Sequence, residues 1–202
     1  MYRAVYIPEN IEPYVRIQEF HARFPELVET RSCIKRVAGL TQTLEVSSKS
    51  DAPIGKKLSA FNLKAYSPAG SQSTVECFYQ GSKVFENGGP YQDLYWKTSR
   101  EAKVDKRLKS SGKLTGYQYG AKKFPLNPNG AFYSWLYCNA LKRIPNILEQ
   151  LKGSEGFTDL FYDPRTGRNC QAFACALFVA TDGLKGIKVS DALSHQDDTY
   201  LY

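Results

Sequence analysis

Residues 74–87, TVECFYQGSKVFEN, are the most informative stretch of the chain for its fold class. A helix is predicted over these residues, because Gly88-Gly89-Pro90 follows them and typically ends a helix. At about 100° per residue, its polar side chains share a stripe about 60° wide. They are Glu76, Gln80, Lys83 and Asn87. The rest of the surface is mostly apolar, so we expect a helix buried on most sides, with the stripe facing water, a partner or a cleft.

Within a cleft, this stripe has the residue types for covalent chemistry. A desolvated lysine such as Lys83 has a lowered pKa and can attack a carbonyl carbon to form a Schiff base. A carboxylate beside it, here Glu76, can take or supply the proton. On an exposed face the same side chains would form ordinary helical ion pairs. The pattern alone leaves both interpretations open.

The flanking segments predict short strands and several helices. Strand patterns occur at residues 4–7, 44–46, 58–66 and 157–162, and the stretch after the first strand is irregular to residue 27. Helical patterns occur at residues 28–40, 98–112, 131–143, 145–151 and 169–181. The second of these helices begins with a capping box, Thr98-Ser99-Arg100-Glu101. We therefore expect the α+β class: one mostly helical domain over residues 1–202 with a small β-sheet, an N-terminal strand-plus-helix extension and a frayed tail at about 195–202.

The positive charge of the chain is concentrated in one segment. The chain has 202 residues, which suits a single domain, and a net charge of +7. Residues 97–123, here called the basic segment, contain the whole excess. Its basic residues are Lys97, Arg100, Lys103, Lys106, Arg107, Lys109, Lys113, Lys122 and Lys123. Such a segment indicates a polyanionic partner, with Tyr117 and Tyr119 able to stack on bases, or it is simply a solvated helix face.

Composition excludes several classes of protein. Apolar residues make up 42% of the chain, which excludes a wholly disordered protein. No apolar run approaches 18 residues, so we expect no membrane-spanning helix. The first residues do not resemble a signal peptide, and we expect a cytoplasmic location. The five cysteines lack CxxC spacing, so neither a disulfide framework nor a metal site is expected, and no cofactor.

Several separated motifs resemble the NADAR family. In the hallmark helix of that family a Glu, an aromatic residue, a Gln and a Lys occur in this order, as they do in residues 74–85. Leu58-Ser59-Ala60-Phe61-Asn62-Leu63 is similar to the LSNFY-type segment upstream. Phe157-Thr158-Asp159-Leu160 and Gly167-Arg168-Asn169-Cys170 stand where the family has its last acidic and Asn-bearing motif. Residues 161–165 replace its usual tryptophan and glycine-rich loop.

The resemblance is closer to one branch, the NADAR antitoxins paired with DarT-type toxins, and covers about residues 44–181. It rests on the motifs above and on residues 44–50, 88–91, 93–95, 100–103 and 169–172. It implies a NADAR-like domain with ADP-ribosyl-guanine hydrolase activity, without metal. Such an antitoxin cleaves the N-glycosidic bond between ADP-ribose and guanine in DNA, which restores the base that the toxin modified. Other members cleave N-glycosidic bonds of small metabolites.

The resemblance also implies roles for individual residues. Lys83 would form a Schiff base with C1 of the opened ribose, Glu76 would be the general acid or base, and Asp159 a second carboxylate. Lys49 is the rival lysine, or a phosphate ligand. The other candidate substrate contacts are Ser48, Asn62, Gln80, Gly89, Tyr91, Asp93 and Asn169. DNA phosphates would be bound by Arg100, Lys103, Lys106 and Arg107.

Two other functions remain open at this point. A small-metabolite N-glycosidase would explain the polar residues of 74–87 but not the basic segment. A non-catalytic protein that binds ADP-ribose or nucleic acid would explain the charge but give Lys83 and Glu76 no role. The sequence also leaves open whether the substrate is DNA, RNA or a free nucleotide.

Overall fold

The computed structural model describes residues 2–11, 14–23, 39–162 and 170–194. Nearly all of the helix predicted at 28–40, the tail at 195–202 and Asn169 lie outside these residues. Helices and small sheets are interspersed along the described chain, which confirms the α+β class. Among these residues no helix has the length and apolar character needed to cross a membrane.

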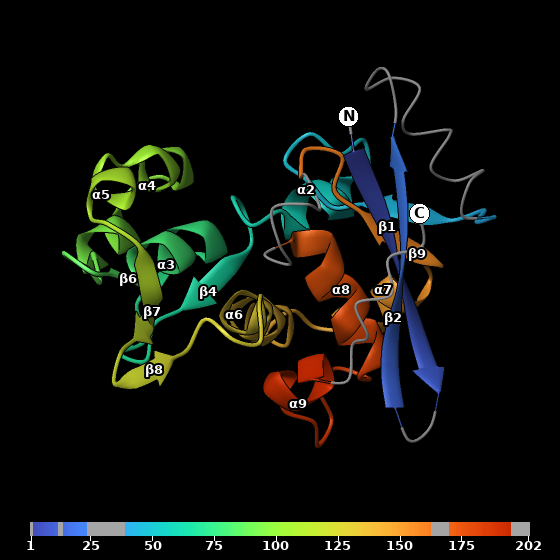
Figure 1. Ribbon diagram of the computed structural model, residues 1–202. Helices are drawn as coiled ribbons and strands as arrows, with labels where there is room; N and C mark the ends of the chain where they lie inside the picture. Colours follow the sequence, from blue (N-terminus) through green and yellow to red (C-terminus); the bar gives the residue numbers. More distant parts are fainter. Residues whose placement is uncertain (1, 12–13, 24–38, 163–169, 195–202) are drawn as a thin grey trace.

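A four-stranded sheet lies at one end of the molecule, with the order β2–β1–β9–β3 (Figure 1). β1 (Tyr2–Ile11) and β2 (Tyr14–Arg23) form an antiparallel hairpin. β9 (Gly156–Thr158) pairs antiparallel with β1 and parallel with β3 (Thr43–Glu45). Strands are therefore present where 4–7 and 44–46 predicted them, but the interpretation of the following stretch as irregular is wrong over residues 14–23. β2 is a strand because it pairs along β1, and that pairing is not a local property of its sequence.

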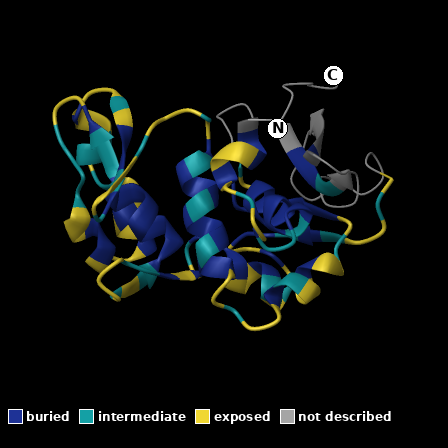
Figure 2. Cartoon of the chain, turned by 90° about the horizontal axis from the view of Figure 1, so that it is seen from below, coloured by how far each residue is buried: buried dark blue, intermediate teal, exposed yellow. Residues whose placement is uncertain are grey.

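Two helices form the middle of the molecule. α6 (Ala131–Leu141) lies between the two ends, and α8 (Gln171–Ala180) packs against β1 and β9 (Figure 1). α8 consists largely of small and apolar residues and is almost wholly buried, as predicted. Figure 2 shows the buried helices at the centre and the exposed residues mostly on the loops around them. The surrounding short helices are α2 (Pro53–Leu58), α7 (Ile147–Lys152) and α9 (Val189–Ser194).

The other end of the molecule carries two smaller sheets. β4 (Lys64–Tyr66) pairs with β5 (Gln72–Thr74), which leads directly into α3 (Val75–Gly81). A three-stranded sheet has the order β6 (Lys83–Phe85), β7 (Leu114–Tyr119) and β8 (Lys122–Phe124). Between β6 and β7 lie a 3-10 helix, η1 (Gln92–Trp96), and two helices, α4 (Ser99–Val104) and α5 (Arg107–Ser110).

The helix predicted over 74–87 is wrong in its second half. α3 ends at Gly81, and Lys83 pairs with Tyr117 of β7. Gly81 lets the ring of Tyr95 pack closely against the end of α3, because a Cβ there would lie 2.6 Å from that ring. The predicted stripe is therefore divided between two elements. Glu76 and Gln80 lie on the helix, whereas Lys83 and residue 87 follow it.

Three other predictions need correction. Residues 58–66 are mostly not a strand: α2 ends at Leu58, and only β4 at the end of this stretch is extended. The strand predicted at 157–162 ends at Thr158. The helix predicted at 98–112 begins with the expected capping box but divides into α4 and α5, because Asp105 has an extended ψ of 128°.

Tyr117 and Tyr119 are core residues and not a base-stacking platform. Both side chains are buried, and their rings lie 4.6 Å and 6.3 Å from the ring centre of Phe132 on α6. Strand alternation from Tyr117 to Tyr119 points both rings to the same face of β7, where α6 covers them. The aromatic side chains of the basic segment thus connect its sheet to the core.

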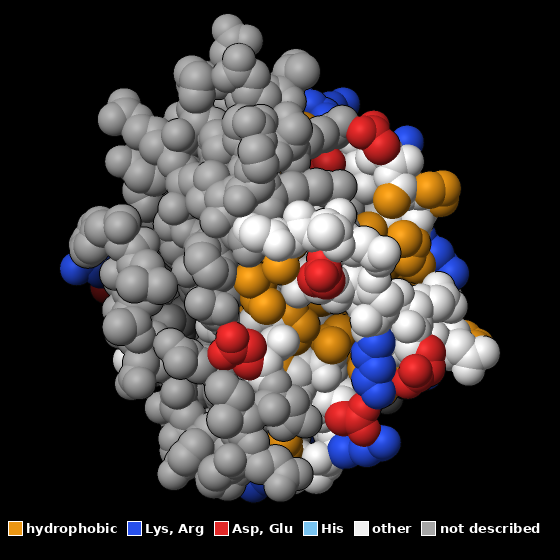
Figure 3. Space-filling view, turned by 90° about the vertical axis from the view of Figure 1, so that its right-hand side faces the viewer, with side chains coloured by type: hydrophobic (Ala, Val, Ile, Leu, Met, Phe, Trp, Pro, Cys, Tyr) orange, Lys and Arg blue, Asp and Glu red, His pale blue; other side chains and the backbone are white. Residues whose placement is uncertain are grey.

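The basic segment lies at the end of the molecule opposite the four-stranded sheet, because it contains α4, α5, β7 and β8 (Figure 1). Figure 3 views the molecule from the sheet side. On the described part of that face, hydrophobic side chains lie among both acidic and basic ones. The excess of positive charge therefore belongs to one end of the molecule.

Candidate active site

Glu76 and Gln80 are held side by side on α3. Thr74 caps this helix, since its Oγ1 accepts the N–H of Cys77 at 3.3 Å. Glu76 in the first turn is buried, and its Oε1 accepts a hydrogen bond from Nε2 of Gln80 at 2.9 Å. Oε1 of Gln80 is buried without a hydrogen-bond partner among the described residues. A buried acceptor of this kind is available to a donor of a bound substrate.

Lys83 is brought back against the same helix by β6. Its Nζ lies 4.7 Å from the ring centre of Tyr79, which precedes Gln80 on α3. Burial lowers the pKa of Lys83, nearby Glu76 opposes this effect, and the positive charge of Lys103 adds to it. A lowered pKa increases the fraction of neutral amine, which is the nucleophilic form.

Asp159 is a buried carboxylate just after β9. Its Oδ1 accepts the N–H of Phe161 at 3.0 Å, and its Oδ2 accepts Nε2 of Gln171 at 2.9 Å. Gln171 also accepts the N–H of Ala60 at 2.6 Å, so it links the sheet, α8 and the segment before β4. Burial raises the pKa of Asp159 to about 6, against the effect of these two hydrogen bonds.

Lys103 and Tyr133 connect these groups electrostatically. Glu76 acts on Lys83, and Lys103 of α4 acts on both Lys83 and Asp159. Glu76 and Asp159 also both act on Tyr133 of α6, whose pKa is raised mainly by burial. The structure therefore groups the three predicted catalytic residues around one region, here called the candidate site. The charge of Lys103 also acts on this site.

Ser48 and Lys49 lie in the turn after β3, and both are exposed. Nζ of Lys49 lies 4.6 Å from the ring centre of Phe161, the residue whose N–H binds Asp159. Lys49 is thus near the border of the candidate site. Because it is exposed, it suits the binding of a phosphate better than Lys83 does.

A family model described as DarT1-associated NADAR antitoxin matches residues 2–201. The chain belongs to this family. The match confirms the resemblance drawn from the separated motifs, and it extends beyond them to nearly the whole chain. A search among curated proteins returned no match.

Two of the predicted substrate contacts of this NADAR antitoxin lie against its own backbone. Nδ2 of Asn62 donates to the carbonyl oxygen of Lys56 at 2.8 Å, near the end of α2. Gly89 has a φ of 81°, and a Cβ there would clash with the carbonyl oxygen of Lys83. Gly89 therefore positions the strand that carries the candidate nucleophile.

Tyr91, Asp93 and Arg107 form a second group. The guanidinium of Arg107 lies 4.5 Å from the ring centre of Tyr91 and binds both oxygens of Asp93, at 3.1 Å and 2.6 Å. It also forms an ion pair with Asp105 at 2.9 Å. The hydrogen bonds from Arg107 lower the pKa of Asp93. Two carboxylates thus engage the single charge of Arg107, whereas Arg100 and Lys106 are exposed on and next to α4 and α5.

Sequence reasoning overlooked the residues that support the carboxylates and the lysine. Tyr79 is one of two aromatic residues between Glu76 and Gln80 in the hallmark helix, and Gln171 lies in the segment Asn169-Cys170-Gln171-Ala172, so both were within recognised motifs. Tyr133 carried no such signal, because only the packing of α6 against α3 brings it near Glu76. The described residues contain no group of three or more side chains placed to hold a metal ion.

Proposed function

We propose that this antitoxin is a hydrolase that cleaves the N-glycosidic bond between ADP-ribose and guanine in DNA, and so reverses the modification made by a DarT-type toxin. The family match supports the antitoxin role. The observation that carries the chemistry is the half-buried Lys83, with a lowered pKa, within electrostatic reach of Glu76. Buried carboxylates and a desolvated amine are the groups that an imine mechanism needs.

The proposed reaction begins when a carboxylic acid protonates the ring oxygen of the ribose. The ring opens as the guanine nitrogen donates its electron pair, which gives a protonated imine between C1 and that nitrogen. The amine of Lys83 adds to C1, and the guanine nitrogen leaves with the proton it receives. Water then adds to the lysine imine, the amine departs, and the open-chain aldehyde closes to free ADP-ribose.

The two carboxylates suit different parts of this sequence. Asp159, with a pKa of about 6, keeps a protonated fraction near neutral pH and can supply the first proton. Glu76 lies within electrostatic reach of Lys83, is oriented by Gln80, and can move protons during addition and hydrolysis. The unpaired Oε1 of Gln80 can accept a hydrogen bond from a ribose hydroxyl.

The test uses a DNA oligonucleotide that carries one ADP-ribosylated guanine. Intact-mass analysis follows the release of ADP-ribose and the restored strand, and borohydride is added in parallel to reduce any lysine imine. Lys83→Arg and Lys49→Arg are a matched pair, since both keep the charge and remove the nucleophile. We expect a trapped adduct on Lys83 and at least a 10³-fold loss of rate in Lys83→Arg only.

Each outcome is decisive. An adduct on Lys49, with activity lost only in Lys49→Arg, would overturn the assignment of the nucleophile. Modified DNA that is bound but stays intact would overturn the hydrolase proposal and leave a binding protein. Hydrolysis of a free ADP-ribosylated guanosine at a higher kcat/KM than the oligonucleotide would favour the metabolite N-glycosidase.

Binding of DNA phosphates is proposed for the exposed cations of α4 and its neighbour Lys106. Arg100→Gln and Lys106→Gln should each weaken binding of the modified strand and lower the slope of log affinity against log salt by about 0.7–0.9. Arg107→Gln is the comparison, because Asp93 and Asp105 already engage this side chain. Equal slopes in all three variants and the parent would contradict a phosphate role.

A further inference from the structure

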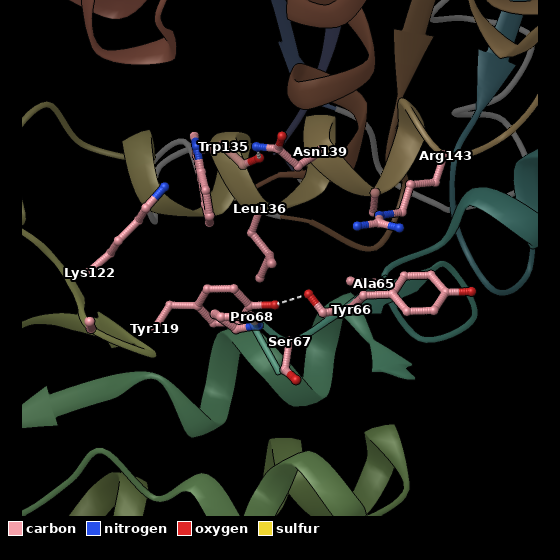
Figure 4. A pocket seen from close by; sticks show the side chains of 12 residues that line it. Ala65, Tyr66, Ser67, Pro68, Tyr119, Lys122, Trp135, Leu136, Asn139 and Arg143 are labelled. Atoms are coloured by element: carbon pink, nitrogen blue, oxygen red, sulfur yellow. Dashed lines mark hydrogen bonds between the residues drawn. The ribbon is translucent and has the colours of Figure 1, made fainter. Parts of the chain in front are cut away.

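A cavity of about 420 Å³ lies between α6, β4 and the β7–β8 hairpin, and it shares no lining residue with the candidate site (Figure 4). Its walls come from α6, from β4 and the turn after it, and from the β7–β8 hairpin. Neither the candidate catalytic residues nor the group around Arg107 contributes to its lining. A volume of this size is within the usual range of small-molecule sites.

Aromatic rings line one part of this cavity. Trp135 of α6 is partly exposed there, and its ring meets that of Tyr119 edge to face at 5.8 Å. The hydroxyl of Tyr119 donates to the carbonyl oxygen of Tyr66, which fixes the ring in the wall, and Figure 4 shows this bond. A partly exposed indole on a fixed aromatic support is a surface on which a nucleic-acid base can stack.

Two cations lie at opposite ends of the cavity. Figure 4 places Lys122 at one end and Arg143 at the other. Nζ of Lys122 lies 5.5 Å from the ring centre of Trp135, and the guanidinium of Arg143 lies 4.5 Å from that of Tyr66. No acidic side chain among the described residues lines the cavity. Its electrostatic complement is therefore an anion with negative charge at both ends.

We propose that this cavity binds one nucleotide of a single-stranded nucleic acid, with the base against Trp135 and the flanking phosphates at Lys122 and Arg143. A nucleotide within a strand has a phosphate on each side of its sugar, whereas a free mononucleotide offers negative charge at one end only. The two separated cations therefore favour the strand. The proposal concerns unmodified nucleic acid and is independent of the hydrolase proposal.

The test measures binding of an unmodified 12-nucleotide single-stranded DNA to the full chain. The chain has two tryptophans, so Trp96→Phe leaves Trp135 as the only indole fluorophore. In this background Lys122→Glu/Arg143→Glu removes both cations of the cavity. Lys123→Glu/Lys142→Glu is the matched control, because it makes the same charge change one residue away from each, outside the cavity lining.

We expect saturable quenching of Trp135 fluorescence by the strand. The cavity double variant should weaken binding at least tenfold and lower the salt slope by about 1.4, which corresponds to two single-strand phosphates. The control should weaken binding less than threefold. Equal weakening in the two double variants, or strand binding without quenching, would overturn the proposal. Quenching by a mononucleotide as tight as that by the strand would overturn the strand assignment.

Discussion

The Nζ of Lys83 lies 4.7 Å from the ring centre of Tyr79, although the two residues belong to different elements. They are four positions apart in the sequence, as in one turn of a helix, but the helix ends at Gly81 between them. The ring favours the ammonium form of Lys83, whereas burial favours the neutral amine. Burial is the largest effect and exceeds the opposing effect of Glu76, so the net direction of the pKa of Lys83 is downward.

Lys103→Met should shift the pH dependence of catalysis. Lys103 lowers the pKa of both Lys83 and Asp159, so its removal raises both. If neutral Lys83 is required, the acid limb of the kcat profile should move to higher pH by about half a unit. Lys109→Met on exposed α5 is the control. A profile that keeps its shape while only KM rises would instead indicate that Lys103 acts in DNA binding alone.

Asp159→Asn should reduce the pH dependence of stability. The pKa of Asp159 rises from an ordinary 3.8 to about 6 on folding, so the folded state keeps its proton after the unfolded state has lost it. The free energy of unfolding therefore falls as pH rises through this window. Between pH 4.5 and pH 7.5 the parent should lose about 2 kcal/mol more than the variant. Urea unfolding at the two pH values measures this, and equal losses would argue against a raised pKa.

Gly89→Ala should destabilise the protein through a clash as well as through its backbone. Gly89 and Gly70 have similar φ values of 81° and 85°, but a Cβ would meet the carbonyl oxygen of Lys83 only at Gly89. A Cβ added at Gly70 has no neighbour within 4 Å. The variant Gly70→Ala therefore measures only the destabilisation caused by the positive φ, about 1 kcal/mol. We expect Gly89→Ala to cost at least about 2 kcal/mol. Similar melting temperatures for the two variants would show that β6 can shift to accommodate the Cβ without a loss of stability.

Thr98→Ala should weaken the start of α4. Oγ1 of Thr98 accepts the N–H of Glu101 at 3.3 Å, and Oε2 of Glu101 accepts the N–H of Thr98 at 2.8 Å. Loss of this cap should cost about 1 kcal/mol in urea unfolding, whereas Thr98→Ser keeps the hydroxyl and should cost little. If both variants unfold like the parent, the cap contributes nothing to global stability.

Local sequence signals determined much of this protein by themselves. The capping box at Thr98, the helix 131–143 with the break at Pro145, and the small-residue helix before Thr181 each depend on neighbouring residues, and each appears in the structure. The family motifs also depend on order and spacing along the chain, and the family match agrees with them. The α+β class and the family could therefore be predicted without coordinates.

Tertiary structure alone decided where the reactive groups lie. Lys83 leaves the helix of Glu76 because β6 pairs with β7, a strand that begins about thirty residues later and had no clear local pattern. Asp159 has a raised pKa because the folded chain buries it, and Gln171 of α8, twelve positions later, donates a hydrogen bond to it. Strand pairing, burial and electrostatic interactions depend on residues that are distant in sequence. The periodicity of a single segment therefore cannot predict them.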